Sequence, residues 1–211
     1  MKKIFLTLVL CSFAGAMFAQ GVKFGVTAGL NVSSLNVTNS GTTDISSKAG
    51  FQAGVLMDWG ITKNFSIIPE LNFSQKGAKL SDSEMGIKID ISTTLNYLTL
   101  PINAAYKFDL GMDQKLIVFA GPYLGYGLSI NNKLGNTTPG VDIQLGESKF
   151  GSNEGQVKPF DFGANAGIGY QYTNIFFKVQ GNWGLINMSN TNIADDNTKN
   201  FNLGVTVGYM F

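Results

Sequence analysis

The stretch FNLGVTVGYMF, residues 201–211, alternates between apolar residues and small, polar or flexible ones. Successive side chains of a β-strand point to opposite faces, so a period of two places one whole set on one face. The stretch therefore predicts a β-strand with one strongly apolar face. The apolar set consists of the odd-numbered residues Phe201, Leu203, Val205, Val207, Tyr209 and Phe211.

The same alternation recurs along the rest of the chain. It occupies seven further segments, residues 22–32, 51–59, 65–73, 89–108, 116–130, 160–172 and 175–185. Within 89–108 the apolar set changes from odd to even positions around Tyr97, which predicts a β-bulge at that point. Together with residues 201–211, these segments predict eight strands.

The connections between the segments alternate between short and long. The short ones lie at 60–64, 109–114 and 173–174, and the long, polar ones lie at 33–47, 76–88, 131–158 and 189–199. An even number of antiparallel strands with tight turns at one end and long loops at the other is typical of bacterial outer-membrane barrels. We therefore expect an all-β fold, an eight-stranded antiparallel up-and-down transmembrane β-barrel with both ends of the chain beside the tight turns.

The composition of the two strand faces distinguishes a membrane barrel from a soluble one, which would alternate in the same way. A soluble exterior carries Lys and Glu, whereas the non-apolar face here is rich in glycine, which suits a cramped interior. The apolar face has aromatic residues at both of its ends, as the two membrane interfaces select. This pattern favours contact with lipid. The expected aromatic girdles contain Trp59, Phe65, Phe108 and Tyr170 beside the tight turns, and Phe73, Tyr126 and Trp183 near the long connections.

The first residues, MKKIFLTLVLCSFAGAMFAQ, have the pattern of a secretory signal peptide. Lys2 and Lys3 precede an apolar run, and small residues then lead to a plausible cleavage site between Ala19 and Gln20, uncertain by a residue or so. A short membrane anchor and a lipoprotein cut before Cys11 are the alternatives. We expect a signal peptide at 1–19 and one barrel domain at 20–211.

Few residues of the chain are suited to catalysis. The sequence contains no histidine, and its single cysteine, Cys11, lies in the expected signal peptide. Histidine-based catalytic triads and metal sites built from nitrogen or sulfur ligands are therefore excluded from the mature chain. The formal net charge of +1 does not favour a nucleic-acid partner. We expect no enzyme activity and no cofactor.

Charged residues on the non-apolar face are expected to lie inside the barrel. A buried charge must be paired, so these residues predict an internal ion-pair network that fills the lumen rather than a reactive site. Within it, Glu70 is expected to pair with Lys107 and Lys178. The full expected network consists of Lys23, Glu70, Lys107, Asp161 and Lys178.

Three motifs resemble a known family. IPELNFSQKGAK at 68–79, YLTLPINAAYKF at 97–108 and FAGPYLG at 119–125 are similar to segments of small outer-membrane β-barrel proteins of the Bacteroidetes, sometimes called PorT-like, which match the OmpA/OmpX type in size. The second motif departs from that family in Ala104, Ala105 and the position of Lys107. The resemblance implies a fold and a location in the outer membrane, and implies no reaction.

These observations predict a non-enzymatic outer-membrane barrel that acts through its long loops. The expected roles are envelope integrity, surface interaction or docking of a secretion or assembly partner, chiefly through the loop 131–158. A lipid-modifying or proteolytic barrel and a narrow pore or ligand carrier are the alternatives.

The last strand should pair with the first, and Tyr209 and Phe211 resemble the terminal signal read by the outer-membrane assembly machinery. Other expected contacts are with outer-membrane lipid.

Overall fold

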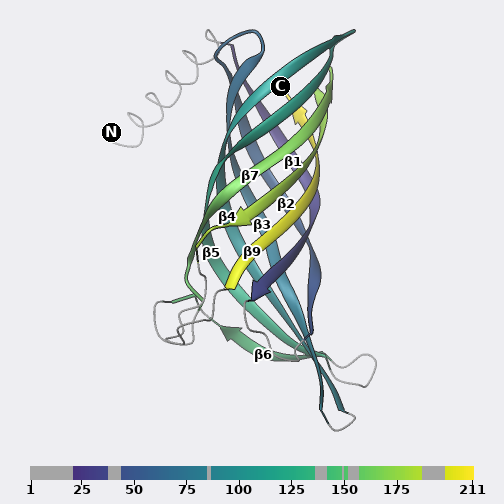
Figure 1. Ribbon diagram of the computed structural model, residues 1–211, viewed down its shortest axis with the longest axis vertical. Coiled ribbons are helices and arrows are strands. Elements are labelled where there is room, and N and C mark those ends of the chain that lie inside the picture. The colour runs from purple at the N-terminus through teal and green to yellow at the C-terminus, as the bar shows by residue number, and fades with distance from the viewer. Residues whose placement is uncertain are drawn as a thin grey trace, which may run out of the picture.

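The computed structural model describes residues 21–37, 44–84, 87–135, 142–148, 150–151, 157–186 and 198–211. These residues form nine antiparallel strands, drawn in Figure 1. The strands are β1 (Val22–Val37), β2 (Asp44–Gly60), β3 (Phe65–Glu84), β4 (Ile87–Gly111), β5 (Gln114–Gly135), β6 (Asp142–Ser148), β7 (Phe160–Tyr172), β8 (Ile175–Gly184) and β9 (Thr198–Met210). No helix in the described part of the chain is long and apolar enough to cross a membrane.

Eight of the nine strands form a closed barrel, which confirms the predicted fold. The wall runs β1-β2-β3-β4-β5-β7-β8-β9, and β9 pairs with β1 from Gly25·Met210 to Val37·Thr198. The ninth strand, β6, lies outside the wall and pairs with the far end of β5. In a closed barrel each wall strand has a partner on both sides, so the wall itself has no exposed edge.

Tight turns join the strands at one end of the barrel, which we call the short-turn end. Met112 and Asp113 link β4 to β5 with φ angles of 50° and 58°, and Thr173 links β7 to β8 with a φ of 51°. These positive φ values give the compact, left-handed backbone of tight hairpins. The turn 61–64 between β2 and β3 and the carboxyl terminus lie at this end as well, and we call the opposite end of the barrel the long-connection end (Figure 1).

The alternation in sequence corresponds to the two faces of the wall. Along β7 and β9, inward residues are mostly buried and outward apolar residues mostly exposed. Large apolar side chains cover the outside of all eight wall strands, while the inside contains mainly glycine, hydroxyl, amide and charged groups. Such an outer surface is stable in hydrocarbon and would aggregate in water.

The expected change of face near Tyr97 is wrong in one respect. The β4–β5 pairing shifts between Asn96 and Tyr97, as a bulge there requires, but the extra residue is Leu128 on β5. Leu95 and Tyr97 therefore stay on the inward face of β4, with exposed fractions of 3% and 0%. Apolar residues point inward here because a cluster of apolar side chains fills the long-connection end of the lumen.

The long connections are shorter than the sequence predicted, because the strands extend beyond the aromatic girdle. β3 continues to Glu84 and β4 starts at Ile87, so most of the expected loop 76–88 is a hairpin. β2 starts at Asp44 and β5 continues to Gly135. Polar strands outside the membrane lack the apolar alternation on which the prediction depended.

Candidate functional site

The lumen of the barrel is filled by side chains around ion pairs. Within the described residues, three pairs follow one another along the lumen: Lys76–Asp161 nearest the long-connection end, Lys178–Glu70 in the middle and Lys107–Asp58 nearest the short turns. Lys76 and Glu70 are six residues apart on β3, which separates the first two pairs by about 20 Å along the strand. Lys178–Glu70 and Lys76–Asp161 join β8 with β3 and β3 with β7 across the lumen, whereas Lys107–Asp58 joins β4 with β2, which are separated by β3 alone.

The outer pair has the most partners. Lys76 Nζ lies 3.1 Å from Asp161 Oδ2, which also accepts hydrogen bonds from Tyr123 Oη at 3.2 Å and Asn200 Nδ2 at 3.1 Å. The Lys76 ammonium also lies 5.1 Å from the ring centroid of Tyr97 and 5.2 Å from that of Tyr123. Cation–π contacts and ionic hydrogen bonds therefore compensate the desolvation of this buried charge.

An apolar cluster lies over the outer pair, toward the long-connection end. Leu95, Tyr97 and Ile130 form its buried part, and Phe150 and Val157 pack against them. The rings of Tyr97 and Phe150 meet edge to face at 5.3 Å. Phe150 and Val157 belong to the connection between β5 and β7, so part of this connection folds back into the lumen and closes it.

The middle pair is bidentate. Lys178 Nζ donates to Glu70 Oε1 at 2.7 Å and to Oε2 at 2.5 Å, and Asn72 Nδ2 donates to Oε2 at 3.1 Å. Lys178 Nζ also lies 5.8 Å from the ring centroid of Phe119. Glu70 and Lys178 are 4% and 6% exposed, so each charge depends on the other for compensation.

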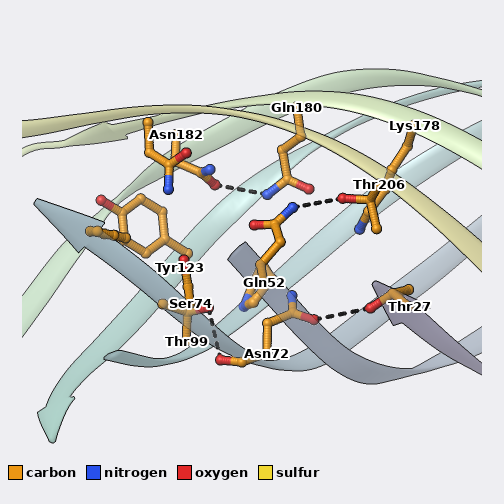
Figure 2. A pocket seen from close by; sticks show the side chains of 13 residues that line it. Thr27, Gln52, Asn72, Ser74, Thr99, Tyr123, Lys178, Gln180, Asn182 and Thr206 are labelled. Atoms are coloured by element: carbon orange, nitrogen blue, oxygen red, sulfur yellow. Dashed lines mark hydrogen bonds between the residues drawn. The ribbon is translucent and has the colours of Figure 1, made fainter. Parts of the chain in front are cut away.

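A polar chamber separates the outer and middle pairs (Figure 2). Gln52 Nε2 donates to Thr206 Oγ1 at 2.6 Å, and Gln180 Nε2 donates to Asn182 Oδ1 at 2.8 Å. The amide and hydroxyl side chains that line the chamber come from β1, β2, β3, β4, β8 and β9, and those labelled in Figure 2 point toward one another across it. Their arrangement binds the sides of the wall together and can retain water.

The pair nearest the short turns differs from the expected network. Lys107 pairs with Asp58 rather than with Glu70, and Lys23 is exposed. Lys23 faces Asp58 on β2, but the β1–β9 ladder begins only at Gly25. Lys23 therefore lies at the rim, where its ammonium stays in water, and none of the ion pairs between described residues includes it.

The network expected from the sequence did not include Asp58, Lys76, Tyr97 or Tyr123. Lys76 was assigned to a loop, although it has the same parity on β3 as Glu70 and Ser74, and this parity could have placed it inside. Asp58 also has inward parity on β2. The parity of Tyr123 was read as inward, but no partner was inferred because Asp161 is distant in sequence.

The geometry of the lumen offers little for catalysis. Each of the carboxylates Asp58, Glu70 and Asp161 is held in an ion pair. Among the described residues, no group of three or more His, Cys, Asp or Glu side chains could hold a metal ion. Several buried polar atoms have no protein partner, most notably both amide atoms of Asn103, and such atoms require partners such as water or a ligand.

The aromatic residues expected in the girdles lie at the two ends of the outer apolar belt. Trp59, Phe108, Tyr170, Tyr126 and Trp183 are 40–48% exposed, and Phe65 and Phe73 are half-buried. Several pair with outward aromatic neighbours, such as Tyr126 with Phe160 at 5.3 Å. Eight residues separate Phe201 from Tyr209 on β9, and a tilted strand of this length spans roughly 20 Å along the barrel axis, close to the height of an outer-membrane apolar band.

The expected assembly signal lies on the outside of the short-turn end. The rings of Tyr209 and Phe211 meet edge to face at 5.6 Å, and both are exposed. The backbone N–H of Phe211 donates to the carbonyl oxygen of Phe24 at 2.8 Å, so pairing with β1 continues to the last residue.

A closed eight-stranded wall, an outer apolar belt with aromatic girdles and a lumen filled by ion pairs together define a class: integral β-barrels of the bacterial outer membrane. The chain belongs to the outer membrane protein beta-barrel domain family, whose model matches residues 18–190.

Solved structures of two outer-membrane barrels share this fold. Neisserial surface protein A (NspA) has a TM-score of 0.50 at 15% identity, over 90% of this chain and 99% of NspA. OprG from Pseudomonas aeruginosa has a TM-score of 0.50 at 10% identity, over 91% of this chain and 97% of OprG. At such identities the likeness concerns the fold alone. No curated protein sequence matches the chain.

Proposed function

We propose that this barrel is a non-enzymatic envelope protein that docks another envelope protein through strands that protrude from the membrane. The supporting observation is the sheet at the long-connection end. β3 continues eleven residues beyond the girdle residue Phe73, to Glu84, which corresponds to about 35 Å of strand. β4 and β5 accompany it, and β6 extends the sheet by one more strand.

The outer edge of β6 is the proposed contact. β6 pairs with β5 through residues such as Leu134·Ile143 and Gly135·Asp142, and within the described residues no strand pairs with its other edge. An unpaired edge offers backbone N–H and C=O groups to an extended segment of a partner. β6 lies within the loop 131–158, from which sequence reasoning expected partner docking.

The lumen supports a structural role rather than catalysis or conduction. The described lumen carboxylates Asp58, Glu70 and Asp161 are each paired with a lysine, and the apolar cluster around Tyr97 and Phe150 lies at the long-connection end of the lumen. A lipid-modifying or proteolytic enzyme would need a convergent set of reactive groups, and a pore would need a continuous aqueous path.

We also propose that residues 1–19, which lie outside the described residues, form a cleaved signal peptide, and that the chain belongs to the Bacteroidetes, PorT-like group that it resembles. The resemblance depends on the motifs at 68–79, 97–108 and 119–125.

The experiment is site-specific photo-crosslinking in cells. A photoreactive amino acid at Gln144 on β6 should crosslink a discrete envelope protein, and replacing residues 136–148 by a short Gly-Ser linker should abolish co-purification of that protein. This linker leaves Phe150 and Val157 in place. Replacement of residues 38–43 by a linker of matched flexibility is the control and should leave co-purification unchanged. Equal co-purification by both linker variants would contradict the proposal.

A further inference from the structure

Three gaps in the strand pairing of the barrel wall lie side by side across four neighbouring strands, β2 to β5. The ladders β1–β2, β5–β7, β7–β8, β8–β9 and β9–β1 are continuous throughout their lengths. Apart from the register shifts at Ser47/Gln52 on β2 and at Asn96/Tyr97 and Asp109/Gly111 on β4, the β2–β3, β3–β4 and β4–β5 ladders each lack two consecutive pairs. The gaps lie between Leu56·Glu70 and Trp59·Ile67, between Pro69·Ile102 and Asn72·Thr99, and between Pro101·Tyr123 and Ala104·Ala120.

Each of these three gaps contains a proline. Pro69 on β3, Pro101 on β4 and Pro122 on β5 have no backbone N–H, so each removes a hydrogen bond from a ladder. Proline is otherwise confined to edge strands and bulges, because a central strand needs both of its hydrogen-bonding edges. In a membrane wall the cost is higher, since lipid supplies no replacement donor. Three such positions in neighbouring strands therefore require a compensating use.

A groove lies on the outside of the wall beside the first interruption. Its volume is about 380 Å³, within the range of ligand pockets. Its lining includes exposed apolar side chains of the membrane belt, and also Leu56 and Glu70, whose side chains point into the lumen. The exposed members are Val26, Val55, Leu71, Leu100 and Phe211.

An inner chamber of the lumen lies behind the same part of the wall. Leu56 and Glu70 line this chamber as well as the groove, and Ile68, Phe176 and Met210 make much of the chamber apolar. At this point the backbone of β2 and β3 separates the two hollows, beside the position where Pro69 donates no hydrogen bond to the ladder.

The inner chamber also contains an amide with free hydrogen-bonding capacity. Asn103 is 1% exposed, lines the chamber, and has a partner for neither Nδ2 nor Oδ1. It faces Ile68, which is adjacent to Pro69 in the first interruption. A group that both donates and accepts a hydrogen bond is the complement of this amide.

We infer that the β2–β3 interruption is a lateral entrance from the bilayer, and that groove and chamber bind a fatty acid with its chain in the groove and its carboxyl group at Asn103. The low dielectric of the bilayer disfavours the ionised carboxylate, so the acid enters protonated, with one donor and one acceptor. Its apolar chain matches the groove lining. This site is independent of the docking edge on β6.

The binding test uses the mature barrel in lipid nanodiscs with dibromostearic acid as the probe. Trp59 lies next to the groove on β2, and Trp183→Phe leaves it as the single tryptophan of the chain. We expect saturable quenching of Trp59 that stearic acid competes away. Methyl stearate, whose ester cannot donate a hydrogen bond, should compete at least tenfold more weakly. Non-saturable quenching, or equal competition by the ester, would overturn the inference.

A disulfide across the wall tests the entrance separately from the groove surface. Val55 faces Leu71 next to the interruption, and opposite residues of antiparallel strands are close enough for a disulfide. In Val55→Cys/Leu71→Cys we expect at least tenfold weaker binding when oxidised than when reduced. The control pair Val179→Cys/Val205→Cys, on the continuous β8–β9 ladder, should bind equally in both states. Equal binding by oxidised and reduced Val55→Cys/Leu71→Cys would refute a lateral entrance.

Single substitutions complete the test. Pro69→Val restores the missing donor and should weaken binding at least tenfold, whereas Pro122→Val, in an interruption that does not border the groove, should leave binding unchanged. Asn103→Leu should remove the preference for the acid over its methyl ester. Heat-modified gel mobility establishes that each variant is folded. A folded Asn103→Leu barrel that keeps the preference would show that Asn103 is not the head-group site.

Discussion

Removing the negative charge of the middle ion pair should destabilise the barrel strongly. Glu70→Gln keeps the shape of the side chain but leaves the Lys178 ammonium, 6% exposed, without a counter-ion. The new amide N–H₂ also faces a donor, because Asn72 Nδ2 points at Glu70 Oε2 from 3.1 Å. Removing one partner of a buried pair costs about 3–5 kcal/mol, and the lower end is appropriate because Lys178 lines a chamber whose polar groups can replace part of the lost interaction. We therefore expect a loss of about 3 kcal/mol, or roughly a hundredfold in the folding equilibrium.

The assay is equilibrium unfolding in urea from lipid vesicles, followed by tryptophan fluorescence and by heat-modified gel mobility. The double variant Glu70→Leu/Lys178→Met removes both charges and should recover most of the lost stability, because a buried pair often contributes little over apolar side chains of similar volume. Asp109→Asn, at the exposed short-turn rim, is the matched control and should be neutral. If Glu70→Gln unfolds within about 0.5 kcal/mol of the unaltered barrel, the lumen pair does not anchor the structure.

Three further predictions concern the ends and the closure of the wall. Gly29→Ala places a methyl group against the backbone carbonyl of Val205 on β9 and should lower the free energy of unfolding by about 1–3 kcal/mol in the same assay. The control is Gly60→Ala, which should be neutral because the atom nearest to the added methyl group is 3.6 Å away. Equal effects of the two substitutions would refute the steric argument. Phe150→Ala removes the ring that packs on Tyr97 at the long-connection end of the lumen, so a protease should cleave the connection between β5 and β7 faster. An unchanged rate of cleavage would mean that the Phe150 ring does not hold this connection in place. Deletion of Phe211 should lower the folded fraction in the outer membrane while export continues, and normal assembly would contradict its role in the terminal signal.

Much of the wall could be predicted from local sequence. In residues 160–172 of β7 and 201–210 of β9 the alternation predicted the two faces correctly, because one face contacts lipid and the other a narrow polar lumen. The tight turn at Thr173 and the pairing of the last strand with the first were also predicted correctly. These features depend on a period of two and on chain connectivity, which are both local.

Other features could not be predicted because they depend on contacts outside the membrane or across the lumen. Lys76 lies in a strand extension where no lipid imposes the apolar pattern, so it was assigned to a loop. Tyr97 was placed on the wrong face, because apolar residues near the outer mouth pack inward against Phe150. Which lysine pairs with which carboxylate depends on the tilt and stagger of the strands, which sequence spacing does not reveal.

The sequence by itself determined that this protein is an all-β chain with one apolar and one small or polar face, since period-two patterning and turn composition are written residue by residue. Only the tertiary structure decided that Lys107 pairs with Asp58 while Lys178 pairs with Glu70, and that three prolines line up across neighbouring strands. The physical reason is closure: rolling the sheet into a barrel with a fixed stagger brings together residues that are distant in the chain, such as Gln52 and Thr206, which lie 154 positions apart.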